Sequence, residues 1–283
     1  MTQGLYQYLN AYGILEEVRT ELNEYSVALC QGTAVGTFDN SDIIRKINGA
    51  QRFIWNALFT RFPELFFTSQ SVTGTAGVYT IPSDCFQLHY ITDGDGKKID
   101  KIPLKTKHLT NCTGSPYLYY RYGNTIVRDD GTSAVLTFYY YKRPRDLTQG
   151  MSSAGGALSL TLAATARKEL NYYQGATIED ITDDWTDVIA SYATTRVATL
   201  TAQTGAANKY YGTVSELPEP FHALIAPRAI ILMKNSVVSP QKPTQQEIAD
   251  FKADFIETIR AFTGTYSDDV DISDMFYSFA PYM

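Results

Sequence analysis

The fold is decided by IIRKINGAQRFIWNALFTRFPELFFTSQSVTGTAGVYT (residues 43–80), where the spacing of apolar residues changes. In the first half they recur at steps of three and four, which places them on one face of a helix. Pro63 ends this pattern, since proline inside a helix removes a backbone donor and clashes with the preceding turn. From Thr68 the period becomes two, which is typical of a strand. The stretch therefore predicts a helix followed by β-structure.

Helical patterns recur at both ends of the chain. A first helix is indicated by apolar residues at helical spacing, namely Leu15, Val18, Leu22, Tyr25 and Leu29. Near the other end, Thr244 and Glu247 form a capping box, in which each side chain satisfies the other residue's free backbone N–H. This box predicts a last helix that runs to Phe262.

The middle of the chain alternates short apolar runs with turn sequences such as DGDG (93–96) and DDG (129–131). Many short strands at this spacing favour antiparallel β-structure. QGMSSAGG (149–156) is rich in Gly and Ser and is interpreted as a linker between two β-modules. Beyond it, alternating leucines predict the first strand of the second module: Leu158, Leu160 and Leu162.

The order helices, strands, strands, helices predicts an α+β fold. In it, the N- and C-terminal helices form one helical bundle, and the antiparallel β-modules are insertions that project from the bundle. The predicted parts are 1–66 (N-terminal helices), 67–150 (β domain), 151–216 (second β-module), 217–264 (C-terminal helices) and 265–283 (C-terminal docking tail).

Composition narrows the class of protein. The formal charge is −6, from 24 Lys and Arg against 30 Asp and Glu, and an acidic chain is a poor general binder of DNA. The 21 tyrosines favour β-structure, contact surfaces or both. No stretch approaches the length of a membrane span, and MTQGLYQYLN (1–10) lacks the pattern of a signal peptide. We therefore expect a soluble protein made in a reducing cytoplasm.

No motif for catalysis or cofactor binding is found, so the chain is predicted not to be an enzyme and to need no cofactor. The histidines, His89, His108 and His222, are interpreted as structural or solvated. The cysteines, Cys30, Cys85 and Cys112, have no metal-ligand spacing and are interpreted as small reduced core residues.

Two charged runs have more than one interpretation. The acidic run is Glu179, Asp180, Asp183, Asp184 and Asp187. It favours a solvated hairpin tip, with a calcium site or a pair of catalytic carboxylates as alternatives. The basic run is Lys97, Lys98, Lys101, Lys105 and Lys107. It favours a surface or a protected edge strand, with phosphate contact as the alternative.

Three passages together resemble one protein type. INGAQRFIWNAL (47–58) leads into SVTGTAGVYTIPSDCFQL (71–88), SPYLYYRYGNTIVRDDGTSAVLTFYYYKRPRDLT follows at 115–148, and LPEPFHALIAPRA at 217–229 opens the last helices. They are similar to the head-to-tail connector or tail-adaptor proteins of double-stranded-DNA tailed bacteriophages, of the short-tailed or crAss-like type. The resemblance implies a virion subunit in the neck or tail. It also implies a ring, usually of about twelve copies, that joins portal to tail and lines a channel for DNA.

The segment 265–283 has four Asp, no Lys or Arg, and five aromatic residues. Left exposed, its apolar residues would form a patch that soluble proteins avoid. We therefore predict that it binds a neighbouring subunit, with the portal preferred. The predicted partner-binding residues are Tyr266, Met275, Phe276, Tyr277, Phe279 and Tyr282. The rival interpretation of the whole chain is a β-rich virion protein that binds carbohydrate or a host surface through tyrosine-rich faces.

Overall fold

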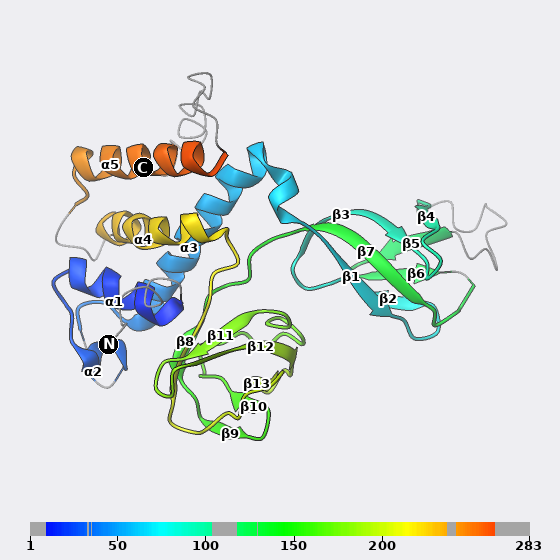
Figure 1. The fold of residues 1–283 in the computed structure, drawn as a ribbon, viewed down its shortest axis with the longest axis horizontal. Helices are drawn as coiled ribbons and strands as arrows, with labels where there is room; N and C mark the ends of the chain where they lie inside the picture. The colour runs from blue at the N-terminus through cyan, green and yellow to red at the C-terminus, as the bar shows by residue number, and fades with distance from the viewer. Residues whose placement is uncertain are drawn as a thin grey trace. The chain divides into compact units, whose positions relative to one another are not determined.

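The computed structural model describes residues 10–32, 34, 36–103, 118–128, 130–236 and 242–263. The chain divides into two units (Figure 1). Unit 1 consists of Met1–Leu58 and Pro144–Met283, and unit 2 of Phe59–Arg143. In the described ranges, fourteen strands form two seven-stranded sheets, and five segments are α-helical.

Unit 2 contains the first sheet, in the order β1-β7-β3-β4-β5-β6-β2. Its strands are β1 (Phe67–Thr73), β2 (Val78–Thr80), β3 (Cys85–Thr92), β4 (Lys98–Lys101), β5 (Leu118–Tyr122), β6 (Thr125–Arg128) and β7 (Val135–Lys142). β1 and β2 stand at opposite ends of this order but follow one another in the chain and contact each other. The sheet therefore nearly closes around one core, which includes Tyr79, Ile91, Ile126, Phe138 and Tyr140.

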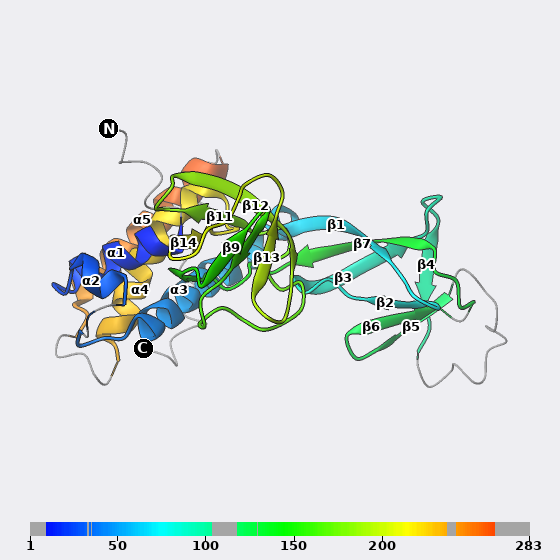
Figure 2. The ribbon, with the colours of Figure 1, turned by 90° about the horizontal axis from the view of Figure 1, so that it is seen from below.

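Strand β7 lies between β1 and β3 in this sheet (Figure 2). It pairs antiparallel with β1 and with β3. Leu136, Phe138 and Tyr140 are buried, because residues two apart in a strand share a face. The alternate residues Tyr139 and Tyr141 are only half-buried and lie on the other face. Strand β7 thus presents aromatic rings on both faces.

Unit 1 contains the helices. They are α1 (Ala11–Glu21), α2 (Val27–Cys30), α3 (Asn40–Arg61, which continues to the start of unit 2), α4 (Ile225–Lys234) and α5 (Gln245–Thr263), with the 3-10 helix η3 (Glu219–Leu224) before α4. Helix α1 packs against α4 and also against β14 of the second sheet. Helix α5 begins as predicted: the N–H of Glu247 donates to Thr244 Oγ1 (3.1 Å) and the N–H of Thr244 to the Glu247 carboxylate (2.7 Å).

The second sheet is also in unit 1, in the order β8-β14-β11-β12-β13-β10-β9. Its strands are β8 (Gln149–Met151), β9 (Ala154–Gly156), β10 (Ser159–Thr161), β11 (Thr177–Asp180), β12 (Trp185–Tyr192), β13 (Val197–Leu200) and β14 (Tyr210–Thr213). β8 and β9 occupy opposite ends of the order, yet only Ser152 and Ser153 separate them in the chain. This one bent segment therefore bridges the two ends of the sheet.

The interpretation of residues 149–156 as a linker is wrong, because they form β8 and β9. Their small side chains serve close packing. A Cβ on Gly155 would lie 2.4 Å from the backbone of Ala206, and one on Gly205 would lie 2.0 Å from the carbonyl oxygen of Ser159. Glycine therefore lets two backbones approach at the point where the sheet closes.

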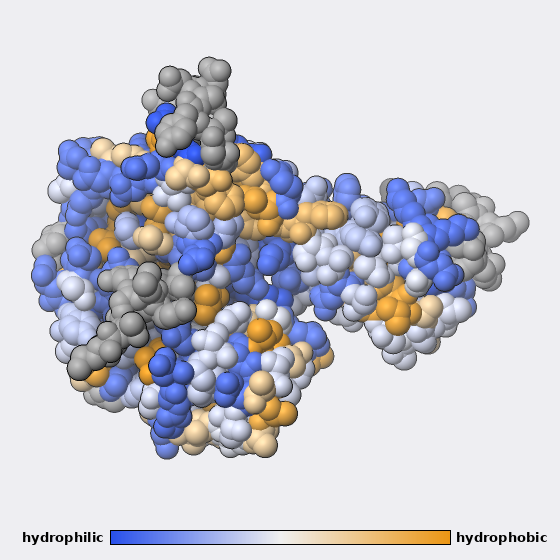
Figure 3. Space-filling model, viewed as in Figure 1, coloured by the Kyte–Doolittle hydropathy of each residue, from blue (hydrophilic) through white to orange (hydrophobic). Residues whose placement is uncertain are grey.

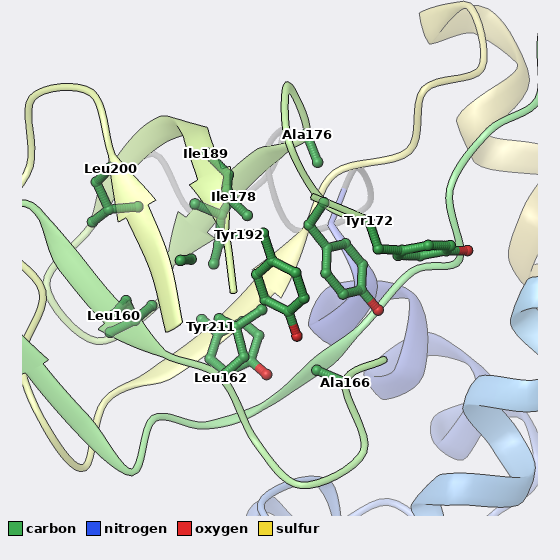
Figure 4. Packing of buried hydrophobic residues seen from close by; sticks show 12 residues of the cluster. Leu160, Leu162, Ala166, Tyr172, Ala176, Ile178, Ile189, Tyr192, Leu200 and Tyr211 are labelled. Atoms are coloured by element: carbon green, nitrogen blue, oxygen red, sulfur yellow. The ribbon is translucent and has the colours of Figure 1, made fainter. Parts of the chain in front are cut away.

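The core of the second sheet is rich in tyrosine (Figure 4). Tyr192 and Tyr211 point into this core from β12 and β14, with Leu160 and Leu162 beside them. Their hydroxyls bind the loop after β10: Tyr192 donates to the carbonyl of Arg167 (2.5 Å), and Tyr211 accepts from the N–H of Ala163 (2.8 Å). Buried tyrosines thus combine apolar packing with hydrogen bonds that order a long loop.

Replacing Tyr211 with phenylalanine is expected to lower the free energy of unfolding of unit 1 by about 1 kcal/mol, because the buried N–H of Ala163 loses its acceptor. Urea unfolding followed by tryptophan fluorescence measures this, since the two tryptophans of the chain, Trp55 and Trp185, both lie in unit 1. A matched control is Tyr122→Phe, whose ring is 69% exposed in unit 2. Equal stability of the two variants would contradict the assignment.

The predicted fold class is wrong. The chain is mostly β-sheet, with two sheets that each surround their own core, and the helices are not a bundle into which β-modules are inserted. The N-terminal helix predicted through Leu29 also ends early, at Glu21. Asn23 then adopts a left-handed φ of 55°, and the short α2 follows. The helical part is therefore smaller than the spacing suggested, and α1 rests on β14 as well as on another helix.

One strand prediction also needs correction. Leu160 and Leu162 are buried in the second core, but Leu158 is 43% exposed and has a φ of 54°. Leu158 belongs to the turn between β9 and β10, so it leaves the alternation that its neighbours follow.

Candidate interaction surface

Several residues singled out in the sequence lie outside the described residues. These are the predicted partner-binding residues Tyr266, Met275, Phe276, Tyr277, Phe279 and Tyr282, and also His108, Cys112, Lys105 and Lys107. The prediction for the C-terminal tail therefore stays a prediction. Within the described ranges, no group of three or more His, Cys, Asp or Glu side chains is placed to hold a metal ion.

The acidic run belongs to the hairpin of β11 and β12, as predicted, from the end of β11 through the turn to the start of β12, but it is only partly solvated. Asp180 is fully buried and accepts hydrogen bonds from the backbone N–H groups of Thr182 and Asp183, both at 2.9 Å. Asp187 is buried as well, and accepts from the backbone of residues 202 and 203. The carboxylates of Asp180 and Asp187 thus shape the turns of the second sheet, a role that the sequence pattern did not reveal.

Three further candidate residues that the structure describes, His222, Cys30 and Cys85, are buried or half-buried within the fold. His222 is buried, and its Nε2 lies 2.7 Å from the carbonyl oxygen of Leu217; burial lowers the pKa of His222. Cys30 is buried and Cys85 half-buried, both as free thiols, and burial raises the pKa of each to about 11. Thiols with a raised pKa are poor nucleophiles at neutral pH, so these side chains suit packing.

Exposed and half-buried aromatic residues gather in unit 2, on the outer face of β1, β7 and β3 and at the end of α3. We call this set the aromatic face; it consists of Phe59, Phe67, Phe86, His89, Tyr90, Tyr139 and Tyr141. Tyr90 stacks on Tyr139 with ring centroids 4.3 Å apart, and Phe67 meets Tyr141 edge-on at 5.5 Å. Phe67 and Phe86 are 41% and 50% exposed. Clustered exposed rings are typical of surfaces that bind another molecule.

Irregularities in β3 build this face. The register between β3 and β7 shifts at two points, between Cys85 and Gln87 and between Leu88 and Tyr90. An extra residue at such a bulge changes which side of the sheet the following side chains occupy. Phe86 and His89 stand at these shifts and are exposed, while Leu88 packs against the core. The bulges therefore bring additional rings to the outer face.

A groove of about 360 Å³ adjoins the aromatic face. We call it the basic groove; it is lined by Phe86–Tyr90 of β3, Lys98–Lys101 of β4, and Tyr119 and Arg121 of β5. Strand β4 pairs with β3 only at Ile91 and Thr92, and then runs beside β5 instead. The separation of β4 from β3 opens the groove along Gln87–Tyr90.

The groove carries positive charge on an acidic protein. Lys98, Lys101 and Arg121 line it against one carboxylate, Asp100, and all four side chains are exposed. The prediction that the lysines lie at the surface is confirmed for Lys97, Lys98 and Lys101. The edge-strand interpretation is wrong, because β4 lies between β3 and β5 in the sheet.

Hydrophobic surface elsewhere on unit 2 is limited in the view of Figure 3, where it gathers over β2 and is surrounded by hydrophilic residues.

Sequence inspection missed both the aromatic face and the basic groove. A signal was present in LTFYYYK (136–142), since an alternating strand with aromatic residues at every position from 138 to 141 exposes rings on a second face.

The fold and this surface define the class: a β-rich protein that exposes aromatic rings beside a basic groove. The family model of the SU10 adaptor protein matches residues 9–163, more than half of the 283 residues. The chain belongs to the SU10 adaptor protein family and is a structural adaptor protein of a bacteriophage virion. No curated protein matches the chain.

The family match covers the candidate surface. All of unit 2, with the aromatic face and the basic groove, lies inside the matched range, whereas most of the second sheet and the tail lie beyond it.

Among the described helices, none combines the length and the apolar character that crossing a membrane requires.

Proposed function

We propose that the protein is one subunit of a cyclic connector ring that joins the portal to the tail and surrounds the channel through which DNA passes. The observation that carries this proposal is the family match over residues 9–163, because an adaptor has to contact the components on either side of it. The aromatic face supports it, since a subunit held by neighbours needs exposed contact surface. Neither the family match nor the groove calls for a carbohydrate-binding role.

The ring is tested by imaging the particle. Reconstruction of the neck region without imposed symmetry is expected to place this chain in copies related by one rotation axis. The isolated chain is expected to include monomers, because rings of this kind can assemble on a preformed template. Copies that show no cyclic relation, or that lie away from the neck, would refute the proposal.

The channel proposal predicts weak binding to DNA. The net charge of −6 repels the phosphate backbone, so the purified full chain is expected to bind duplex DNA no more tightly than about 10⁻⁴ M at physiological salt. Fluorescence anisotropy with a labelled duplex at several salt concentrations measures this. Tight binding that weakens steeply with salt would contradict a channel wall past which DNA slides.

We propose further that residues 265–283 form a docking segment for a neighbouring subunit. Burying three of its aromatic or methionine side chains contributes roughly 1.5–3 kcal/mol each, less the cost of ordering the segment. Deleting residues 265–283 is expected to leave the melting temperature of the isolated chain nearly unchanged and to abolish incorporation into connectors. Normal incorporation, or a collapse of the melting temperature, would contradict this proposal.

A further inference from the structure

The basic groove and the aromatic face together form one continuous surface, because Phe86, His89 and Tyr90 belong to both. One side of this surface offers the cations Lys98, Lys101 and Arg121, and the other offers exposed rings. A partner that matches it must therefore carry acidic and apolar side chains close together.

The groove is also shaped for an extended partner. Within the described residues, no strand pairs with β3 on the β4 side between Gln87 and Tyr90. A peptide that enters there can lie along β3 as an added strand, with main-chain hydrogen bonds for affinity and alternate side chains for specificity. The surface thus selects a segment of chain over a folded domain.

The chain itself contains a segment with this chemistry. Residues 264–283 carry Asp268, Asp269, Asp271 and Asp274, no Lys or Arg, and five aromatic residues. In an extended chain, successive side chains point to opposite sides. Asp269 and Asp271 would then share one side with Met275, Tyr277 and Phe279, and Asp268 and Asp274 would share the other with Val270, Ile272 and Phe276. Each side of the extended segment therefore carries acidic and apolar residues close together, which is the combination that the cations and rings of the surface require.

We propose that the basic groove and the aromatic face of unit 2 bind residues 264–283 of a neighbouring copy of this chain. The inference deepens the proposed function, because the neighbouring copy is supplied by the ring. It assigns the tail to a second copy, whereas the sequence by itself favoured the portal. Duplex DNA is the weaker candidate for the groove, because the described part of its lining combines aromatic sheet walls with three cations, which suits a peptide better than a phosphate backbone.

The test uses the full chain and a fluorescein-labelled synthetic peptide of residues 264–283, with binding measured by anisotropy. The groove variant is Lys98→Glu with Lys101→Glu. The control variant is Lys46→Glu with Lys168→Glu, which makes the same change of charge in unit 1. The groove variant is expected to bind the peptide about tenfold more weakly, and the control to stay within about twofold of the original chain. Thermal melting of each variant verifies that it is folded.

A charge exchange makes the test specific. A peptide with all four aspartates changed to lysine is expected to bind the groove variant more tightly than the original chain. Failure of the unmodified peptide to bind, equal weakening by the groove and control variants, or no recovery on charge exchange would each overturn the proposal. Displacement of the peptide by an equal concentration of short duplex DNA would assign the groove to nucleic acid instead.

A further variant separates binding between copies from binding within one copy. The full chain with Asp268, Asp269, Asp271 and Asp274 changed to lysine cannot fill its own groove by charge attraction. Dilute original chain and this variant are expected to bind the unmodified peptide equally if the tail serves a neighbour. Tighter binding by the variant would show that the tail occupies its own groove, against the proposal. Peptide binding needs no assembled particle, so its failure is distinguishable from failure of the ring proposal.

Discussion

Replacing Arg19 with alanine is expected to lower the free energy of unfolding of unit 1 by about 3–5 kcal/mol, because it removes one member of a buried polar network. The Arg19 side chain is only 2% exposed, although it lies on a helix. Its guanidinium donates to Asn40 Oδ1 at 2.7 and 3.0 Å, and to the carbonyl of Phe38 at 2.8 Å. The substitution leaves these acceptors without a donor and opens a cavity.

The loss of stability should extend beyond α1, because Asn40 also binds the end of α2. Its Nδ2 donates to the carbonyls of Leu29 and Cys30, at 2.9 and 3.1 Å, so Arg19 and Asn40 tie α1, α2 and α3 together. Arg19→Lys keeps the charge but loses the forked geometry, and an intermediate loss is expected.

Urea unfolding followed by tryptophan fluorescence provides the measurement, because both tryptophans lie in unit 1. The matched control is Arg45→Ala in α3, whose side chain is 72% exposed and paired with Asp42; its loss is expected to stay below about 0.5 kcal/mol. A loss below about 1 kcal/mol for Arg19→Ala would show that the network does not hold these helices together.

Replacing Asp187 with alanine is expected to destabilise the second sheet by about 3 kcal/mol, since its carboxylate satisfies several donors at once. Oδ2 accepts from the N–H groups of Ala202 and Gln203 at 2.9 and 2.8 Å. The other oxygen accepts from the N–H of Val188 and from the hydroxyl of Thr201. Without the carboxylate, the loop that follows β13 loses its anchor to β12.

The same carboxylate makes stability depend on pH. Burial by itself raises the pKa of Asp187, but its hydrogen bonds outweigh burial and lower the pKa to about 2. A carboxyl whose pKa is lower in the folded state stabilises the fold above its unfolded pKa and loses that contribution as the pH falls through the folded pKa. The original chain should therefore lose about 2 kcal/mol between roughly pH 4 and pH 2 that Asp187→Ala no longer has to lose.

Unfolding curves at pH 7 and at several values down to pH 2 measure both effects. Asp254→Ala is the control, because Asp254 lies exposed on α5 away from the second sheet. The difference in stability between the original chain and Asp187→Ala is expected to shrink as the pH falls. A difference that stays constant over this range would exclude the carboxylate as its source.

The candidate surface could be predicted from the sequence only in part. The basic run was recognisable as surface, and Lys98 and Lys101 do line a groove. The rings beside them are contributed by Phe67, His89 and Tyr141, from three different strands. Which of these residues share a face depends on the register of β3 with β7, including its two shifts. Register is set by pairing between distant segments, so periodicity within one strand cannot reveal it.

The sequence by itself determined the local elements with a strong signal. Pro63 ends α3 because it cannot continue a helix, and Thr244 with Glu247 begins α5 through side-chain bonds within one turn. The change of apolar spacing at Thr68 likewise predicted β-structure, and β1 begins at Phe67. These elements depend on neighbours within a few residues, so they can be predicted from the sequence.

Only the tertiary structure decided how those elements combine. Closure of the second sheet depends on Gly155 and Gly205, which lie fifty residues apart and matter because two backbones approach there. Burial of Arg19 depends on Asn40, which no helical spacing connects to it. Such contacts draw their free energy from residues that meet only after folding, and a pattern read along the chain does not contain them. For that reason the helix and strand signals at Pro63, Thr68 and Thr244 were correct in place, while the expected helical framework was not.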